Sequence, residues 1–276
     1  MARVCRPHSV INDNPGVFSA IVMGAPSMDE QGFQSRLSRI ATRWTMLRKA
    51  HGPVEDDVQA AQAALFERYQ RAIYGYLVTS LRDHDAADEV FQEFAVKFLS
   101  GGFRRADPSR GRFRDYLKTA IIRLMVDYRR KLARENPHFV PEAPELEAPA
   151  EEANPSESFD SVWRDELLTR AWKSLEAHEQ ETGQPYHAVL HYRTQHPDQS
   201  SAEMAEGLTA QLTPERPYTS AAVRKTLQRA REKFADLLIA EVAASLETGE
   251  PDAIEEELID LGLVPYCRSA VQRLRG

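Results

Sequence analysis

Basic and aromatic side chains are concentrated in one stretch of the chain. Between Leu99 and Arg134 there are eleven Lys/Arg and three acids, a local net charge of +8 in a chain whose formal net charge is −7. Lys and Arg neutralise phosphates, and aromatic rings stack on unpaired bases. The aromatics among these charges are Phe103, Phe113, Tyr116 and Tyr128. The stretch therefore predicts a surface for a polyanion, with nucleic acid as the best fit; the plain alternative is a solvated basic helix face.

A second polar, basic set lies in a long helical pattern near the C-terminal end. Val223, Leu227, Ala230, Phe234 and Leu237 form its apolar stripe. Its other side carries Arg224, Lys225, Gln228, Arg231 and Lys233. A helix with long polar side chains in its first turns, preceded by a shorter helix and a turn, is typical of helix-turn-helix DNA readers. A simple packing helix is the alternative.

Two further constellations have weaker chemical meaning. His187 and His191 share one helix face at a spacing that metal sites use, but no third ligand and no general base accompanies them. The acids Asp88, Glu89 and Glu93, with Gln92 beside them, fit a charged docking surface better than acid–base catalysis. We expect no metal and no cofactor.

Composition favours a helical, cytoplasmic protein. Hydrophobic residues make up 42% of the 276, which supports folded cores, and few β-branched runs occur. Only Cys5 and Cys267 are present, which predicts neither a disulfide framework nor a metal knuckle and suits a reducing cytoplasm. No segment approaches the length of a membrane span, and the short apolar run 17–23 makes a poor signal peptide.

Apolar periodicity and breakers predict an all-α fold of two small helical domains joined by an acidic flexible linker. The expected helices cover 54–81, 86–99, 112–134, a region starting near 161, 186–194, 201–212, 220–244 and 264–274. The expected domains are an N-terminal extension without fixed structure at 1–27, an amphipathic helix at 28–53, a first domain at 54–134, the linker at 135–160, a second domain at 161–245 and an acidic extension at 246–276.

Acidic segments flank the second domain. Residues 135–160 and 241–260 each hold eight acids and no Lys or Arg. The plain interpretation is a solvated spacer and a solubilising tail, without regular structure. The alternative is that these anions fold over the basic surfaces and compete with DNA phosphates.

The first domain resembles region 2 of bacterial sigma-70 family RNA polymerase sigma factors of the extracytoplasmic-function (ECF) type. The matching stretches are LFERYQRAIYGYLV, DHDAADEVFQEFAVKFL and FRRADPSRGRFRDYLKTAIIRLMVDYRRK. Tyr116 stands where the family usually has Trp, and Arg123 where Asn is frequent. The second domain resembles region 4, through SAEMAEGL and SAAVRKTLQRAREKF, although the turn at 213–219 is longer than the family's.

The resemblance implies partners and residue roles. Core RNA polymerase would bind through its largest-subunit clamp helices and its β flap, promoter DNA would be the second partner, an anti-sigma factor is a further candidate, and no membrane is involved. The residues facing polymerase would be Asp88, Glu89, Gln92 and Glu93. The minus-10 region would meet Arg104, Arg105, Asp107, Arg110, Arg112, Phe113, Lys118, Arg123, Asp127, Arg129 and Arg130. The minus-35 region would meet Ser220, Arg224, Lys225, Gln228, Arg229 and Arg231.

The sequence thus predicts a non-enzymatic transcription initiation factor that directs promoter recognition and DNA opening. Two alternatives stay open: a helix-turn-helix regulator that acts without core polymerase, and a metal-dependent hydrolase that uses His187 and His191.

Overall fold

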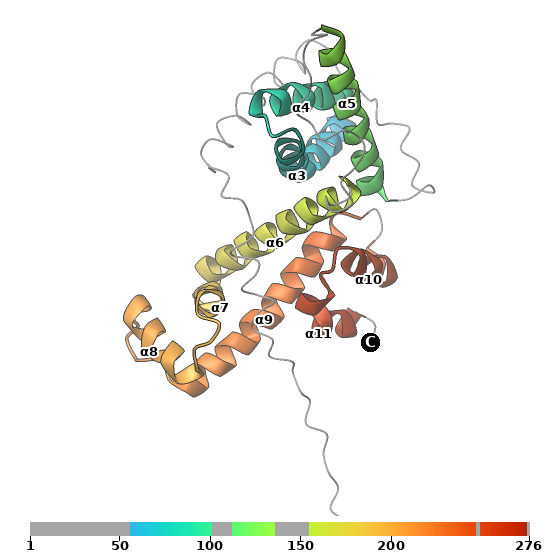
Figure 1. Cartoon of the computed structure of the whole chain (residues 1–276). Helices are drawn as coiled ribbons and strands as arrows, with labels where there is room; N and C mark the ends of the chain where they lie inside the picture. The colour runs from blue at the N-terminus through green and yellow to red at the C-terminus, as the bar shows by residue number, and fades with distance from the viewer. Residues whose placement is uncertain (1–55, 101–111, 136–154, 247–248, 275–276) are drawn as a thin grey trace, which may run out of the picture. The chain divides into compact units, whose positions relative to one another are not determined.

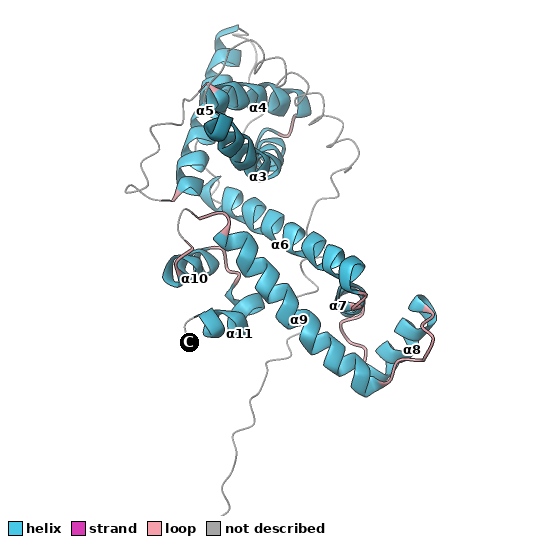
Figure 2. Cartoon of the chain, turned by 180° about the vertical axis from the view of Figure 1, so that it is seen from behind, coloured by secondary structure: helices cyan, strands magenta, loops and turns pink. Residues whose placement is uncertain are grey.

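The computed structural model describes residues 56–100, 112–135, 155–246 and 249–274. Within these ranges the chain is all α-helix with connecting loops and no strand, as predicted (Figures 1 and 2). The helices are α3 (Asp56–Leu81), α4 (His84–Leu99), α5 (Phe113–Glu135), α6 (Pro155–Thr182), α7 (Tyr186–Gln195), α8 (Ser201–Leu212), α9 (Ser220–Ala243), α10 (Pro251–Asp260) and α11 (Val264–Leu274). None of these helices combines the length and apolar character that crossing a membrane requires. The expected helix at 28–53 and the extension at 1–27 lie outside the described residues.

The chain divides into two compact units. The α7–α8 unit includes residues 174–234, and the α3–α5 unit includes the described residues of 27–173 and 235–276. The division falls within α6 and within α9. The sequence had instead predicted domain boundaries at the ends of these helices, near 160 and 245.

Aromatic side chains form the core of the α3–α5 unit. Phe66 on α3 lies 5.8 Å from the rings of both Phe91 and Phe98 on α4. From α6, Trp163 stacks on Tyr69 with ring centroids 4.6 Å apart. Aromatic pairs of this kind add roughly 0.5–1.5 kcal/mol each beyond the area that they bury. The apolar sides of α3 and α4 therefore face each other in this core, and the start of α6 belongs to the same core.

The turn between α3 and α4 is set by local chemistry. Arg82 ends α3 in a left-handed conformation, with φ at 53°. The carboxylate of Asp83 then accepts hydrogen bonds from the backbone N–H groups of Asp85 at 2.8 Å and Ala86 at 3.3 Å. An N-cap of this kind contributes about 1 kcal/mol. Because Asp83 is the cap, α4 begins at His84, two residues before the predicted start.

The two acidic segments are more ordered than expected, where they are described. α6 begins at Pro155, so residues 155–160, assigned to the linker, are helical; proline is tolerated in a first helical turn. The tail contains α10 as well as the predicted α11, so the expectation of an irregular acidic tail is wrong for residues 251–260. Ile254, Leu258, Leu261 and Leu263 are buried there, and this apolar burial explains the order.

In the α7–α8 unit, α8 starts with a capping box. The Ser200 side chain accepts from the Glu203 backbone N–H, and the Glu203 carboxylate accepts from the Ser200 backbone N–H. Its predicted bounds of 201–212 are confirmed. Within the long α9, Val223, Leu227 and Ala230 are buried as predicted. The stripe then continues through Leu238 in place of the predicted Leu237, which is only half-buried.

Candidate nucleic-acid interface

The predicted polymerase-facing residues lie along one side of α4. Glu89 and Glu93 are exposed, and each makes a surface ion pair, with Lys131 at 2.9 Å and Lys97 at 2.7 Å respectively. Asp88 is half-buried and accepts a hydrogen bond of 2.7 Å from the Tyr74 hydroxyl. Gln92 is also half-buried. Only the two glutamates are therefore well exposed, while Asp88 also helps to tie α4 to α3.

The outer face of α5 presents charges to solvent. Arg123, Asp127 and Arg130 are exposed and recur at helical spacing, so they share one face. Arg130 and Asp127 are 3.9 Å apart, a loose pair that contributes little to stability. Arg129 donates to the Ser80 backbone carbonyl at 3.2 Å. This face combines accessible guanidinium groups with one carboxylate.

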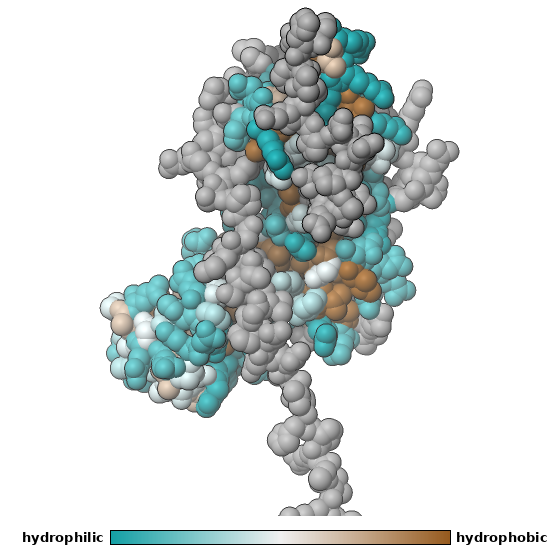
Figure 3. Space-filling view, viewed as in Figure 1, coloured by the Kyte–Doolittle hydropathy of each residue, from teal (hydrophilic) through white to brown (hydrophobic). Residues whose placement is uncertain are grey.

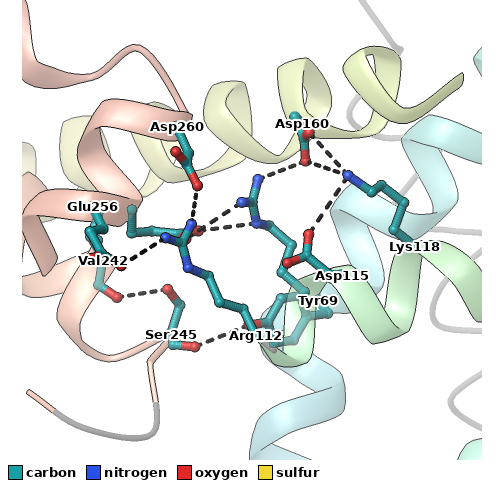
Figure 4. A network of polar contacts seen from close by, with 11 residues as sticks. Tyr69, Arg112, Asp115, Lys118, Asp160, Val242, Ser245, Glu256 and Asp260 are labelled. Atoms are coloured by element: carbon teal, nitrogen blue, oxygen red, sulfur yellow. Dashed lines mark hydrogen bonds and ion pairs between the residues drawn. The ribbon is translucent and has the colours of Figure 1, made fainter. Parts of the chain in front are cut away.

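The first turns of α5 are different, because their cations meet carboxylates from elsewhere in the same unit (Figure 4). Arg112 contacts three acids of α10: Glu257 at 2.8 Å, Glu256 at 3.4 Å and Asp260. Lys118 lies 3.2 Å from Asp160 at the start of α6. Two of the predicted DNA-contacting residues, Arg112 and Lys118, are therefore engaged within the chain in this structure.

Arg114 sits at the centre of this cluster and was not singled out by the sequence. Its side chain is 6% exposed and donates to Asp160 at 2.6 Å. Its Nε lies 3.1 Å from Glu257, whose side chain is 2% exposed; this N–H is not aligned for a good hydrogen bond, so the contact is an ion pair. The sequence signal was present as three basic residues within seven positions, but nothing local indicated that one of them is buried.

Burial and charge oppose each other at this cluster. Burial raises the pKa of the Glu257 carboxyl, although the positive charges of Arg114 and Arg112 act to lower it. Burial alone would lower the pKa of Arg112, but the hydrogen bond to Asp260 and the charge of Glu257 raise it overall. The desolvation of these groups thus offsets part of their mutual attraction, as is usual for buried ion pairs.

The predicted duplex-reading residues lie in the first half of α9. Arg224, Lys225, Gln228 and Arg229 are exposed, whereas Ser220 and Arg231 are half-buried. Gln228 donates to Glu232 at 3.1 Å. The exposed set provides three cations and one amide on consecutive turns, which matches the side-chain types that contact phosphates and base edges.

The other candidate site residues that the sequence predicted are not part of the surfaces described above. Arg104, Arg105, Asp107 and Arg110 lie outside the described residues. The rings of His187 and His191 stack with centroids 5.5 Å apart. Burial, followed by the charge of His187, lowers the pKa of His191. In the described part of the chain, no group of three or more His, Cys, Asp or Glu is arranged to hold a metal ion.

Comparison with known proteins gives one match. Residues 65–135 fit the family model Sigma-70 region 2. No curated protein and no solved structure matches the chain. Residues 65–135 are thus similar to region 2 of sigma-70 family sigma factors, proteins that are involved in promoter recognition by RNA polymerase.

Proposed function

We propose that this protein is an ECF-type sigma factor, which binds core RNA polymerase and directs it to promoters that it helps to open. The observation that carries the proposal is the match of residues 65–135 to sigma-70 region 2. Three charged surfaces of the described residues support the separate steps. We further propose that the protein acts in the cytoplasm beside polymerase and contributes no catalytic group of its own.

The exposed acids of α4 support polymerase docking. Glu89 and Glu93 lie one turn apart, and their ion pairs with lysines are exposed at the surface. Exposed pairs contribute roughly 0.2–1 kcal/mol each, so a basic partner surface can replace the lysines at little cost. The apolar side of α4 is buried against α3 and plays no part in this exchange.

The exposed face of α5 supports strand binding. Arg123 and Arg130 are accessible for phosphate contacts, and Tyr116 offers a ring that is 37% exposed, beside Phe113 at 6.5 Å. A cationic face with accessible rings is the combination that single strands require. In the α7–α8 unit, the exposed residues at the start of α9 support duplex reading of the minus-35 element.

Reconstituted transcription tests the proposal. Purified core polymerase plus this protein is expected to initiate at discrete promoters, mapped by sequencing RNA 5′ ends. A protein that binds duplex DNA but gives no specific initiation with core polymerase would instead be a helix-turn-helix regulator. An anti-sigma factor would appear as a partner that abolishes the specific initiation.

A charge-reversal pair tests the docking surface. Glu89→Arg with Glu93→Arg is expected to weaken core binding in a competitive pull-down. The matched control, Glu67→Arg with Glu176→Arg, reverses one exposed acid of α3 and one of α6 and should bind normally. Equal binding by the two variants, with normal circular dichroism, would remove α4 from the interface.

Strand opening is tested with Arg123→Ala plus Arg130→Ala. This variant should still bind polymerase but leave promoter thymines protected from permanganate. Removing a guanidinium group that binds a phosphate is also expected to reduce the salt slope of DNA binding by about one unit. Wild-type permanganate reactivity in the variant would contradict the role of this face.

A further inference from the structure

The start of α5 is the place where the proposed DNA-binding surface and the acidic tail meet. Figure 4 shows Arg112, the residue immediately before α5, facing Glu256 and Asp260 on α10, with Asp160 and Lys118 beside them. Arg112 and Glu257 are 145 positions apart in the sequence, and their atoms are 2.8 Å apart. The guanidinium group that is expected to meet a nucleic-acid phosphate is therefore occupied by carboxylates of the same chain.

The cluster has a buried centre and an exposed rim. Arg114 and Glu257 form the centre, with side chains 6% and 2% exposed. Glu256 and Asp260 form the rim, at 71% and 52% exposed. The carboxylates of Glu256 and Asp260 lie where a phosphate would approach Arg112. They would repel the phosphate, because both groups are negatively charged. A phosphate that pairs with Arg112 in their place must displace them.

Several contacts hold the tail in this position. The Tyr69 hydroxyl donates to the Ser245 carbonyl at 3.2 Å, and Arg68 pairs with Glu241 at 3.1 Å. α10 buries Ile254 and Leu258, while Ile259 on the same helix is 57% exposed, and Figure 3 shows hydrophobic residues reaching the surface over α10. The acidic segment is thus a docked helix with a defined register, and its carboxylates reach Arg112 at fixed positions.

We propose that α10 is a built-in competitor, whose carboxylates close the Arg112–Arg114 site to nucleic acid until α10 is displaced. The inference rests on the proposed role of α5 in binding DNA. Its ligand class is single-stranded nucleic acid, whose phosphates replace the carboxylates of Glu256 and Asp260.

The contacts that hold α10 in place are weak enough for a nucleic-acid strand to displace it. α10 is ten residues long, and a helix of that length is marginal in water without its packing partners. The rim pairs are exposed and hence weak, and the buried pair carries a desolvation penalty that offsets its attraction. A strand that brings several phosphates can therefore compete with α10, more readily at low salt where the strand's own binding is strongest.

Neutralising the rim tests the competition in the full-length chain. The probe is a fluorescein-labelled oligothymidine single strand, and the readout is its anisotropy. Glu256→Gln with Asp260→Asn is expected to bind the strand about two- to thirtyfold more tightly than wild type, the range that two exposed ion pairs represent. The control, Glu250→Gln with Asp252→Asn, removes two exposed acids from the same segment outside the cluster and should show a smaller gain.

Adding Arg112→Gln to the Glu256→Gln, Asp260→Asn variant should abolish the gain in strand affinity, because the guanidinium group that α10 covers is then absent. Equal affinity of the rim and control variants would overturn the proposal, since only net charge would then matter. A gain that persists without Arg112 would overturn it as well.

Hydrogen exchange of the wild-type chain tests the displacement directly. Backbone amides of residues 252–260 should exchange faster when the oligothymidine is bound, while those of α8 should not. Strand binding with unchanged protection of α10 would refute the proposal. Neither measurement contains polymerase, so the proposal stands or falls separately from the promoter-specific transcription that tests the proposed function.

Discussion

Gly207 lies in the middle of α8, where the packing against α7 leaves no room for a side chain. A Cβ at this position would lie 1.8 Å from the Tyr192 hydroxyl oxygen and 2.6 Å from the ring carbon that bears it. Tyr192 is buried, with its ring 4.4 Å from that of His196. The change Gly207→Ala therefore requires the Tyr192 ring to move within a packed site.

The expected change in the free energy of unfolding is the sum of two opposing effects. Alanine in a helix interior gains about 0.5–1 kcal/mol over glycine, whereas overpacking costs about 1–3 kcal/mol. A 1.8 Å approach belongs in the upper part of the overpacking range, about 2–3 kcal/mol, so a net loss of about 1–2.5 kcal/mol is expected. Gly75 on α3 is the matched control, because its added Cβ would meet the Val162 side chain at an ordinary 3.5 Å. Gly75→Ala is accordingly expected to gain about 0.5–1 kcal/mol.

Urea unfolding followed by circular dichroism measures both changes. The loss at Gly207 should largely disappear when Tyr192 is already alanine, because the clashing ring is then absent. A Gly207→Ala variant as stable as wild type would refute the reasoning, and so would an equal loss in the two backgrounds.

Three shorter predictions follow from other sites. Burial raises the pKa of Glu257 above its ordinary 4.5, so wild type should lose stability as pH rises from 4.5 through the raised pKa. Glu257→Gln should flatten that part of the pH profile of unfolding, and an unchanged profile would contradict the assignment. Burial raises the pKa of Cys267 to about 12, so in a Cys5→Ser chain a thiol reagent at neutral pH should label only the unfolded protein. Arg224→Ala should relax base preference in the upstream promoter element by about 1–3 kcal/mol and spare the downstream one, as measured by selection from a randomised promoter.

Local patterns predicted most helices correctly, because helix formation depends on neighbours in the sequence. Residues 201–212 were placed to the residue, since a Ser/Glu capping box marks the start. In α4, Val90, Phe91, Phe94 and Phe98 recur at helical spacing, and all four are buried as that spacing indicates. The tail helix was missed because residues 241–260 are dominated by charge, and their few apolar residues gain stability only when tertiary partners bury them.

Some features of the candidate site could likewise be predicted from the sequence, and others could not. The sequence by itself determined which segments carry the charge: a basic α5, an acidic face on α4 and an acidic tail. It also determined that Arg123, Asp127 and Arg130 share a face, since helical spacing requires it. Only the tertiary structure decided that Arg114 is buried and that Arg112 faces the carboxylates of α10. Those partners come from positions 145 residues apart, and an ion pair between two helices leaves no periodic trace in the sequence of either one.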